Sequence, residues 1–354
     1  MAVKSIQIDA FTVFEKLAIE FSSGINVFIG ENGTGKTHLL KLLYAAHVIR
    51  SNNPASASEV FGEDFETIFT ITHKDDSLDI SYRAMGKGLQ KKARKGSEEL
   101  IKFINENDIT PDDIGIVMDE NTKIDIGEDD PPLIVVSDNL SSAIFIPAKD
   151  MLTHGRLEKD YREYDLPFDT TLIDILDKAG TSALRNLGSE MAEVLTKISA
   201  IIGGNVVYRG DRYYIQKQNN ILVGFDMEAE GFKKLGLIYR LIETGHIRKG
   251  SVLLWDEPEA NINPKLIPDL VDIILTLEQA GVQMFFATHD YFFAKFLEVR
   301  KKKDINVMYF ALYKGENDKK VQCESNHDFE LLENNSIIAQ SIALYKEEVK
   351  KVMA

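Results

Sequence analysis

The sequence predicts an α/β protein built on a mostly parallel sheet. Between residues 205 and 315, apolar runs typical of strands alternate with amphipathic helical patterns, which is the order expected of consecutive βαβ units. A second observation is the glycine-rich sequence FIGENGTGKT at residues 28–37, which joins an apolar run to a helical pattern. A third is the apolar run at residues 252–255, which is followed by two adjacent carboxylates. Together these features predict an α/β fold that binds a phosphate group.

The composition is that of a folded protein with an acidic surface. Of the 354 residues, 44% are hydrophobic and 27% are charged, which excludes wholesale disorder. The formal net charge of -15 argues against attraction of the whole surface to nucleic acid or anionic lipid. The single cysteine, Cys323, cannot form an intrachain disulfide, and neither a signal peptide nor an apolar run of about 18 residues is evident. We therefore expect a cytoplasmic protein without a membrane partner.

The expected elements follow the hydrophobic pattern in chain order. Strands are predicted at 3–11, 16–21 and 25–29, followed by a helix at 37–50. Further strands are expected at 66–72, 78–82 and 143–147, and residues 149–203 have a mainly helical pattern. Strands then return from residue 206, followed by a helix at 231–243, a strand at 252–255, a helix after Pro264, a strand at 282–287, a helix from Tyr291 and a strand at 305–312.

These elements suggest a division of the chain into a core and three further segments. We expect residues 1–50 and 205–325 to form the core, and residues 51–141 to be an insertion. Residues 142–204 are expected to form a helical lobe, and residues 326–354 a C-terminal helical segment. The insertion is set apart by polar segments and acidic turns such as GEDDPP.

The glycine-rich sequence has the spacing of a phosphate-binding loop, Gly30-x-x-x-x-Gly35-Lys36-Thr37. Glycines let successive backbone N–H groups turn toward one anion, and the N-terminus of the following helix adds its dipole. Lys36 is placed to reach the β- and γ-phosphates of a nucleotide, and the Thr37 hydroxyl can bind Mg²⁺. The residues expected to hold the nucleotide are Asn32, Gly33, Thr34, Gly35, Lys36, Thr37 and His38.

The acidic pair Asp256 and Glu257 follows an apolar strand. In an open α/β sheet, ligands bind at the carboxyl ends of the strands. Asp256 is therefore expected to hold Mg²⁺ together with Thr37, and Glu257 to activate the attacking water. On the next strand of the pattern, Thr288 and His289 occupy the corresponding end, so His289 is expected to contact the γ-phosphate.

The motifs GENGTGKT, LLWDEPE and ATHD occur in an order that resembles the ABC-type ATPase heads of the SMC, RecF and OLD-like ATPases. The resemblance implies a P-loop NTPase fold of mixed sheet, helical lobe and small inserted subdomain, with ATP and Mg²⁺ as cofactors. It also implies that Glu257, His289 and Lys36 are catalytic, with Glu257 as the catalytic glutamate and His289 as the switch histidine. Two such heads would hold ATP between them as a homodimer or higher oligomer.

One motif departs from that family pattern. The expected Leu-Ser-Gly-Gly-Gln signature is replaced by a sequence around Ala229, Glu230 and Gly231, which keeps a glycine before a helix but lacks the serine. The resemblance implies that this loop contacts the nucleotide of the other subunit. Without the serine, the Gly231 N–H and Lys233 or Lys234 are expected to supply the contact, so that turnover would be slow. No clear Q-loop glutamine follows the strand near residue 146, where Lys149 is found instead.

A basic cluster lies inside the expected insertion and has two possible interpretations. Its members are Lys87, Lys91, Lys92, Arg94 and Lys95. Such runs are usually solvated loops, but they also contact nucleic acid or an acidic partner.

Four functions remain open at this point. The leading hypothesis is an ATP-hydrolysing head that switches a dimer or larger assembly and works with a separate effector, a nuclease or toxin, in a bacterial defence system. Alternatives are a RecF-like DNA-binding repair ATPase and an adaptor that binds ATP without significant turnover. The ATPase subunit of a transporter is the fourth, and the altered signature, the Glu-Pro-Glu sequence and the insertion argue against it.

Overall fold

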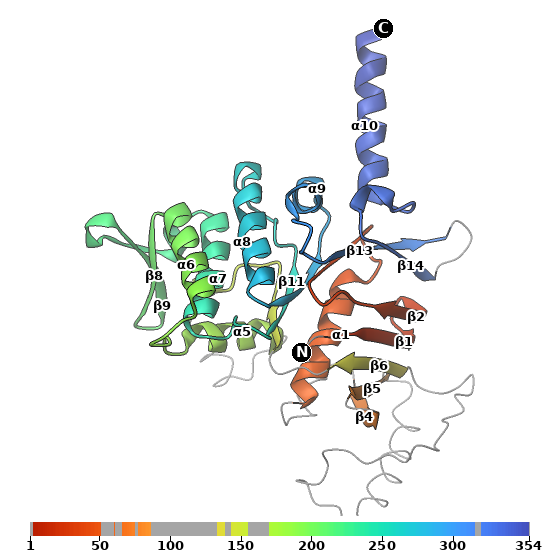
Figure 1. Cartoon of the computed structure of the whole chain (residues 1–354), viewed down its shortest axis with the longest axis horizontal. Coiled ribbons are helices and arrows are strands. Elements are labelled where there is room, and N and C mark those ends of the chain that lie inside the picture. The colour runs from red at the N-terminus through yellow and green to blue at the C-terminus, as the bar shows by residue number, and fades with distance from the viewer. Residues whose placement is uncertain are drawn as a thin grey trace, which may run out of the picture.

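The structure is a computed structural model that describes residues 3–50, 60, 66–74, 77–85, 133–138, 143–154, 170–315 and 320–353. At its centre is a six-stranded sheet with the order β14-β13-β3-β12-β11-β7 (Figure 1). The strands are β3 (Ile25–Gly30), β7 (Ala143–Ile146), β11 (Val252–Asp256), β12 (Gln283–Ala287), β13 (Val307–Lys314) and β14 (Val321–Asn326). All neighbours pair in parallel except β13 and β14. The predicted α/β fold with a mostly parallel sheet is confirmed.

Both faces of this sheet are buried, and each face has its own core. Every residue of β3 and of β12 is buried. Val27 and Ile29 contribute to one core, whereas Phe28, between them, contributes to the other. Because a strand alternates its side chains, a strand covered on both sides needs a continuous apolar run. This is why the strands were recognisable in the sequence as mainly apolar segments.

Helices cover the two faces unequally. Helix α1 (Lys36–Arg50) packs on one face, with Leu39 and Leu43 in the core that contains Phe28. The opposite core is covered by a larger set of helices (Figure 1). These are α5 (Thr170–Gly180), α6 (Ser189–Ile202), α7 (Glu230–Glu243), α8 (Ile267–Gln279) and α9 (Tyr291–Arg300).

A second sheet joins the N-terminus to the expected insertion. Its order is β2-β1-β6-β5-β4, and its strands are β1 (Ser5–Phe11), β2 (Phe14–Glu20), β4 (Glu66–Lys74), β5 (Ser77–Met85) and β6 (Leu133–Asp138). The strands expected at 66–72 and 78–82 are present and slightly longer. Strand β6 was not expected, and it pairs with β1 antiparallel, as in Ile6 opposite Val136. The three described strands of the expected insertion thus share a sheet with the first strands of the chain.

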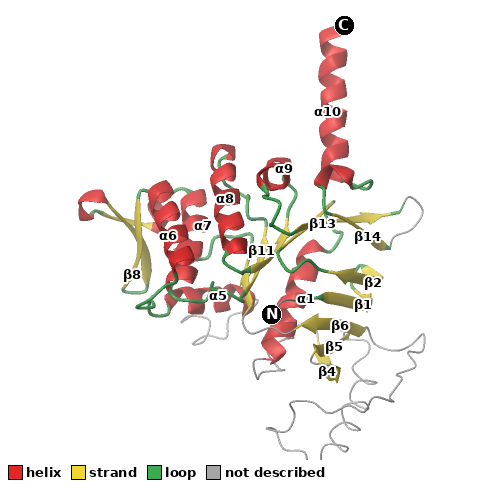
Figure 2. Ribbon diagram, in the orientation of Figure 1, coloured by secondary structure: helices red, strands yellow, loops and turns green. Residues whose placement is uncertain are grey.

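A third, antiparallel sheet of β8 (Gly204–Arg209), β9 (Arg212–Lys217) and β10 (Leu222–Gly224) packs against α6 and α7 (Figure 2). Val206 and Ile215 of this sheet lie in the same core as Ile198 and Ile238 of the helices. Short 3-10 helices occur at Leu152–His154, Gln218–Asn220, Phe225–Met227, Pro264–Leu266 and Phe329–Leu331.

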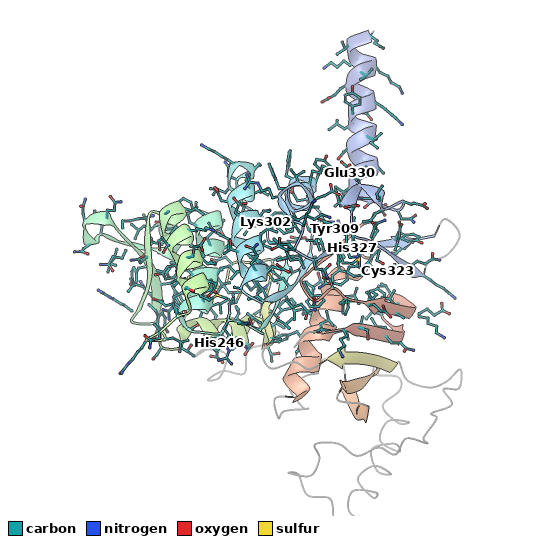
Figure 3. The ribbon with its side chains drawn as sticks, viewed as in Figure 1. His246, Lys302, Tyr309, Cys323, His327 and Glu330 are labelled. Atoms are coloured by element: carbon teal, nitrogen blue, oxygen red, sulfur yellow. The ribbon has the colours of Figure 1, made fainter. Side chains whose placement is uncertain are left out.

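The last described helix, α10 (Ser336–Met353), extends away from the rest of the chain (Figure 1). None of its residues is buried. At its base, Tyr309 of β13 packs against Phe329, with ring centroids 5.6 Å apart, and Cys323 lies nearby on β14 (Figure 3). No helix among the described residues is both long enough and apolar enough to span a membrane.

Gly30, the last residue of β3, offers a test of how the central sheet holds the loop that follows. Its φ is +148°, and a Cβ there would lie 2.2 Å from the Leu312 carbonyl oxygen of β13. We expect Gly30→Ala to lower the free energy of unfolding by about 3 kcal/mol or more, because the backbones of β3 and β13 must move apart to make room for the added Cβ. The control is Gly33→Ala, where φ is +75° and, among the described residues other than its two chain neighbours, no atom lies within 4 Å of the added Cβ, so only about 1 kcal/mol of backbone strain is expected. Urea unfolding without nucleotide measures both, and equal losses would contradict the close approach.

Candidate active site

Glycines set the backbone of the loop between β3 and α1, and a side-chain hydrogen bond within the loop stabilises it. Gly33 and Gly35 have φ values of +75° and +88°, a region that glycine adopts without strain. The Thr34 hydroxyl donates to the Glu31 carbonyl oxygen at 2.8 Å, and Thr34 is only 1% exposed. The loop therefore presents backbone outward while the side chain of Thr34 points inward.

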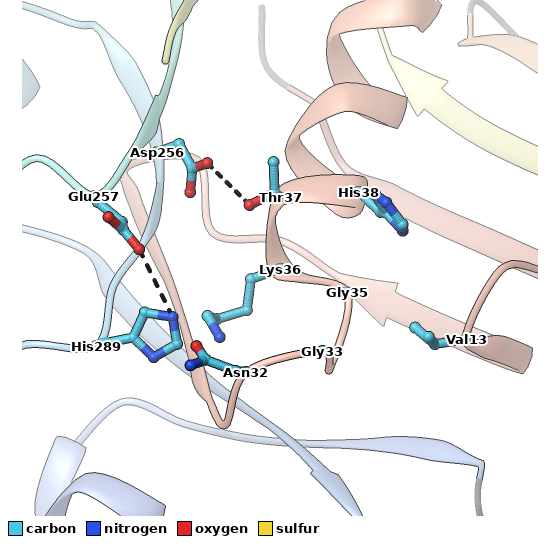
Figure 4. A pocket seen from close by; sticks show the side chains of 10 residues that line it. All are labelled: Val13, Asn32, Gly33, Gly35, Lys36, Thr37, His38, Asp256, Glu257 and His289. Atoms are coloured by element: carbon cyan, nitrogen blue, oxygen red, sulfur yellow. Dashed lines mark hydrogen bonds and ion pairs between the residues drawn. The ribbon is translucent and has the colours of Figure 1, made fainter. Parts of the chain in front are cut away.

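A cavity of about 280 Å³ lies in front of this loop (Figure 4). The residues that line it are Val13, Asn32, Gly33, Gly35, Lys36, Thr37, His38, Asp256, Glu257 and His289. All of these except Val13 were named from the sequence. Of the residues named for nucleotide binding, Thr34 is the one whose side chain does not line the cavity. Val13 sits in the turn between β1 and β2, where a single valine gives no recognisable signal.

Lys36 lies across the loop at the start of α1. Its ammonium group donates to the carbonyl oxygens of Gly30 and Glu31 at 2.8 and 2.9 Å. Burial lowers the pKa of Lys36 to about 8, although the nearby carboxylates of Asp256 and Glu257 raise it. A phosphate group in the cavity would supply the negative charge that this partly desolvated ammonium lacks.

Thr37 and Asp256 form the oxygen pair expected to hold a metal ion. The Thr37 hydroxyl donates to Asp256 Oδ2 at 2.9 Å, which links α1 to the end of β11 (Figure 4). Burial raises the pKa of Asp256 and Glu257 adds to this effect, while the bond from Thr37 opposes it. Two adjacent oxygen donors at the edge of a phosphate site suit Mg²⁺, which keeps several of its waters and takes few protein ligands. The residues present therefore fit this ion.

Glu257 and His289 face each other across the cavity. His289 Nε2 lies 3.9 Å from Glu257 Oε1 (Figure 4). The Glu257 N–H donates to the Ala287 carbonyl oxygen at 2.9 Å, and its φ is +47°. Burial lowers the pKa of His289 and so does Lys36, whereas Glu257 raises it. A carboxylate and an imidazole at this spacing can both reach a water molecule next to a bound phosphate.

The segment expected to serve as the signature loop lies outside the cavity. Ala229 is the N-cap of α7, and Glu230 and Gly231 are its first residues. Ala229 is exposed, whereas Gly231 is buried against Ile262 of its own chain. None of the three lines the cavity.

Within the single chain both the Lys233 and the Lys234 ammonium groups bind residues of their own chain, and the expectation that one of them reaches a partner's nucleotide stays a prediction. Lys234 donates to the Glu257 carbonyl oxygen at 2.8 Å, and Lys233 pairs with Glu230 at 2.6 Å. Burial lowers the pKa of Lys234 to about 8, although Glu259 and other carboxylates raise it. A signal for this was present: Lys234 lies four residues before Ile238 on the apolar stripe of α7.

Two further sequence candidates are not among the described residues that line the cavity. Lys149 is exposed and does not line the cavity. The basic cluster Lys87, Lys91, Lys92, Arg94 and Lys95 lies outside the described residues.

The fold and the cavity define a P-loop ATPase domain. Residues 99–294, more than half of the chain, match the family described as "AAA domain, putative AbiEii toxin, Type IV TA system", and the chain belongs to this AAA family. Residues 1–170 match the AAA ATPase domain. The second match contains the glycine-rich loop, and the first contains the acidic pair and His289.

Known relatives share parts of the chain. The DNA replication and repair protein RecF of Agathobacter rectalis is 34% identical over 125 residues, which are 33% of this chain and 34% of that protein. RecF of Shouchella clausii is 33% identical over 92 residues, 25% of each chain. The chain thus matches about a third or less of the length of these relatives. The SMC head domain from Thermotoga maritima is 11% identical, with a TM-score of 0.46 over 92% of this chain and 98% of that one. The predicted membership of an ATPase family with this phosphate loop is confirmed by the two family matches, and a part of the chain is similar to RecF.

Removal of the Lys36 ammonium tests the phosphate site. We expect Lys36→Ala to weaken ATP binding at least ~100-fold, because charge-assisted contacts to the phosphates are lost. The control is Lys41→Ala on the same helix, since the Lys41 ammonium binds the Val60 carbonyl oxygen and lies outside the cavity. Calorimetry measures the affinity, and thermal unfolding checks the fold. An unchanged affinity in a folded Lys36→Ala protein would contradict the assignment.

Proposed function

We propose that this chain binds MgATP in the described cavity and hydrolyses it. The observation that carries the proposal is the convergence of three groups on one cavity: Lys36 in the phosphate loop, the bonded pair of Thr37 and Asp256, and the facing side chains of Glu257 and His289. Each group matches one requirement of phosphoryl transfer to water, namely phosphate binding, metal binding and water activation.

The proposed roles follow from position. The loop from Asn32 to His38 holds the phosphates, and Thr34 contributes only its backbone because its hydroxyl is bonded to Glu31. Thr37 and Asp256 would hold Mg²⁺, which supplies charge neutralisation for the phosphate oxygens when it is bound. Glu257 orients and deprotonates the attacking water, and His289 contacts the γ-phosphate.

Assembly is the second part of the proposal. The side chains of Glu257 and His289 are 40% and 37% exposed, so water surrounds the proposed hydrolytic groups in the single chain. A second copy that closes over the cavity would exclude this water and place its own Ala229–Gly231 segment against the nucleotide. The absent signature serine leaves fewer donors for the phosphate, which favours slow turnover.

Two biological settings fit the proposal, and a different comparison supports each of them. The family description names a toxin of a toxin–antitoxin system, which favours a defence role in which this head switches a separate effector. The match to RecF favours instead a repair ATPase that contacts DNA, and the basic cluster at residues 87–95 would then be its candidate contact. An adaptor without turnover is a further alternative, and it is distinguished by the hydrolysis measurements below.

Substitution of the two adjacent carboxylates should have different effects. We expect Glu257→Gln to bind ATP normally and to hydrolyse it about 10²–10⁴ times more slowly, because the amide cannot take a proton from water. Asp256→Asn should instead weaken binding of ATP in the presence of Mg²⁺ and have little effect without the ion. Calorimetry and a phosphate-release assay separate the two. Equal hydrolysis rates for the wild type and Glu257→Gln would favour the adaptor.

The dimer is tested at the exposed start of α7. We expect Glu257→Gln to associate when ATP and Mg²⁺ are added, and Ala229→Trp in that background to block association while each chain still binds ATP. A bulky residue at Gly231 would be a poorer probe, because Gly231 is buried in its own chain. The control is Ala192→Trp on the exposed side of α6, which should leave association intact. Light scattering measures the mass, and association unaffected by Ala229→Trp would refute this interface.

A further inference from the structure

Glu259 is a buried carboxyl group that the proposed chemistry does not use. It lies two residues after Glu257 in the turn that follows β11, and it does not line the cavity. Its Oε1 atom accepts a hydrogen bond from the Thr288 hydroxyl at 2.7 Å and a longer one from the His289 N–H at 3.4 Å. Its Oε2 atom is shielded from solvent and has no hydrogen-bond partner among the described residues. Such a group carries a desolvation cost that needs an explanation.

The contacts of Glu259 join the two segments that carry the proposed hydrolytic side chains. Thr288 is fully buried between the end of β12 and the start of α9, and its hydroxyl also accepts from the Asp290 N–H at 3.0 Å. His289, between them, therefore has a fixed backbone on both sides. Glu259 in turn is held by the short turn that begins at Glu257, in which the Ala260 N–H donates to the Glu257 carbonyl oxygen at 3.1 Å.

The same turn is also held from the helical side. Lys234 of α7 donates to the Glu257 carbonyl oxygen at 2.8 Å, and the Glu257 N–H is bound to Ala287. The backbone of Glu257 is thus fixed to β12 and α7, whereas its side chain is free to face the cavity. Glu259 supplies the side-chain link between this turn and the segment of His289.

We propose that Glu259 is a positioning residue for ATP hydrolysis, which fixes the spacing between Glu257 and His289 by binding the Thr288 hydroxyl and the His289 backbone. The inference rests on the proposed function of this site. Glu259 acts through its neighbours and touches neither nucleotide nor metal. A displacement of about 1 Å in a catalytic group is enough to lower a rate ~100-fold, so a buried link of this kind affects turnover more than binding.

The protonation of Glu259 decides which substitution mimics it. Burial raises the pKa of Glu259 to about 7 and Asp290 adds to this, while the bonds from Thr288 and His289 oppose it. A substantial share of the molecules therefore carries a neutral carboxyl at neutral pH. Glutamine has the same shape and keeps one oxygen that can accept from Thr288 and His289, so Glu259→Gln should preserve the link.

The experiment compares four proteins: the wild type, Glu259→Gln, Glu259→Ala and Thr288→Val. We expect Glu259→Ala and Thr288→Val to lower kcat about 10- to 100-fold while their Kd for ATP stays within about threefold of the wild type. Glu259→Gln should keep kcat within about threefold of the wild type. Thr288→Val removes only the hydroxyl, so it remains informative if Glu259→Ala does not fold. Three outcomes would overturn the proposal. They are an equal loss of kcat in Glu259→Gln and Glu259→Ala, an unchanged kcat in both Glu259→Ala and Thr288→Val, and a loss of ATP affinity as large as the loss of kcat.

A second measurement separates this proposal from the proposed function. If the wild type hydrolyses ATP no faster than Glu257→Gln, the proposed function fails, and kinetics no longer report on Glu259. The ring resonances of His289 in an NMR spectrum, assigned with His289→Asn, do not require turnover. They should move in Glu259→Ala and Thr288→Val and stay at the wild-type position in Glu259→Gln. If the His289 resonances are unchanged in all three variants, that result alone would contradict the positioning role of Glu259.

Discussion

The parallel pairing of β3, β12 and β11 is the constraint on which the site depends. The backbone ladder continues past the strands, because the Thr288 N–H donates to the Phe28 carbonyl oxygen and the Glu257 N–H to that of Ala287. The ends of three strands that are distant in sequence are therefore held side by side at one edge of the sheet. The side chains that follow them need no long reach to meet, since the backbone already places them around one cavity.

The parts that could be predicted from the sequence are those in which local chemistry decides the structure. Burial on both faces requires the apolar runs of β3, β11 and β12, and the start of α1 requires glycines and a lysine if it is to bind phosphate. Asp256, Glu257 and His289 were recognisable because polar residues directly after such runs must lie at the carboxyl edge. For these residues, position along the chain determines position in the fold.

The parts that were missed depend on contacts between distant segments. Strand β6 is adjacent to β1 only through the folded sheet, and nothing near residue 133 identifies that partner. Lys234 and Glu259 are charged residues in buried positions, which composition rules assign to the surface. Their burial is explained by what they bind, the Glu257 carbonyl oxygen and the Thr288 hydroxyl. The burial of Lys234 could be inferred from the apolar stripe of α7, but the partners of Lys234 and Glu259 follow only from how α7, β12 and the turn after β11 pack together.

The left-handed backbone at Glu257 has a consequence for how this chain balances stability against activity. Among the described residues, six that are not glycine have positive φ, and four of the other five are asparagine or aspartate, whose short polar side chains tolerate this conformation. Glutamate does not, and its conformation there costs about 1–2 kcal/mol. A chain optimised for stability alone would carry glycine or asparagine at this position. The role in water activation that we propose for Glu257 would account for a longer carboxylate at this position at the expense of stability.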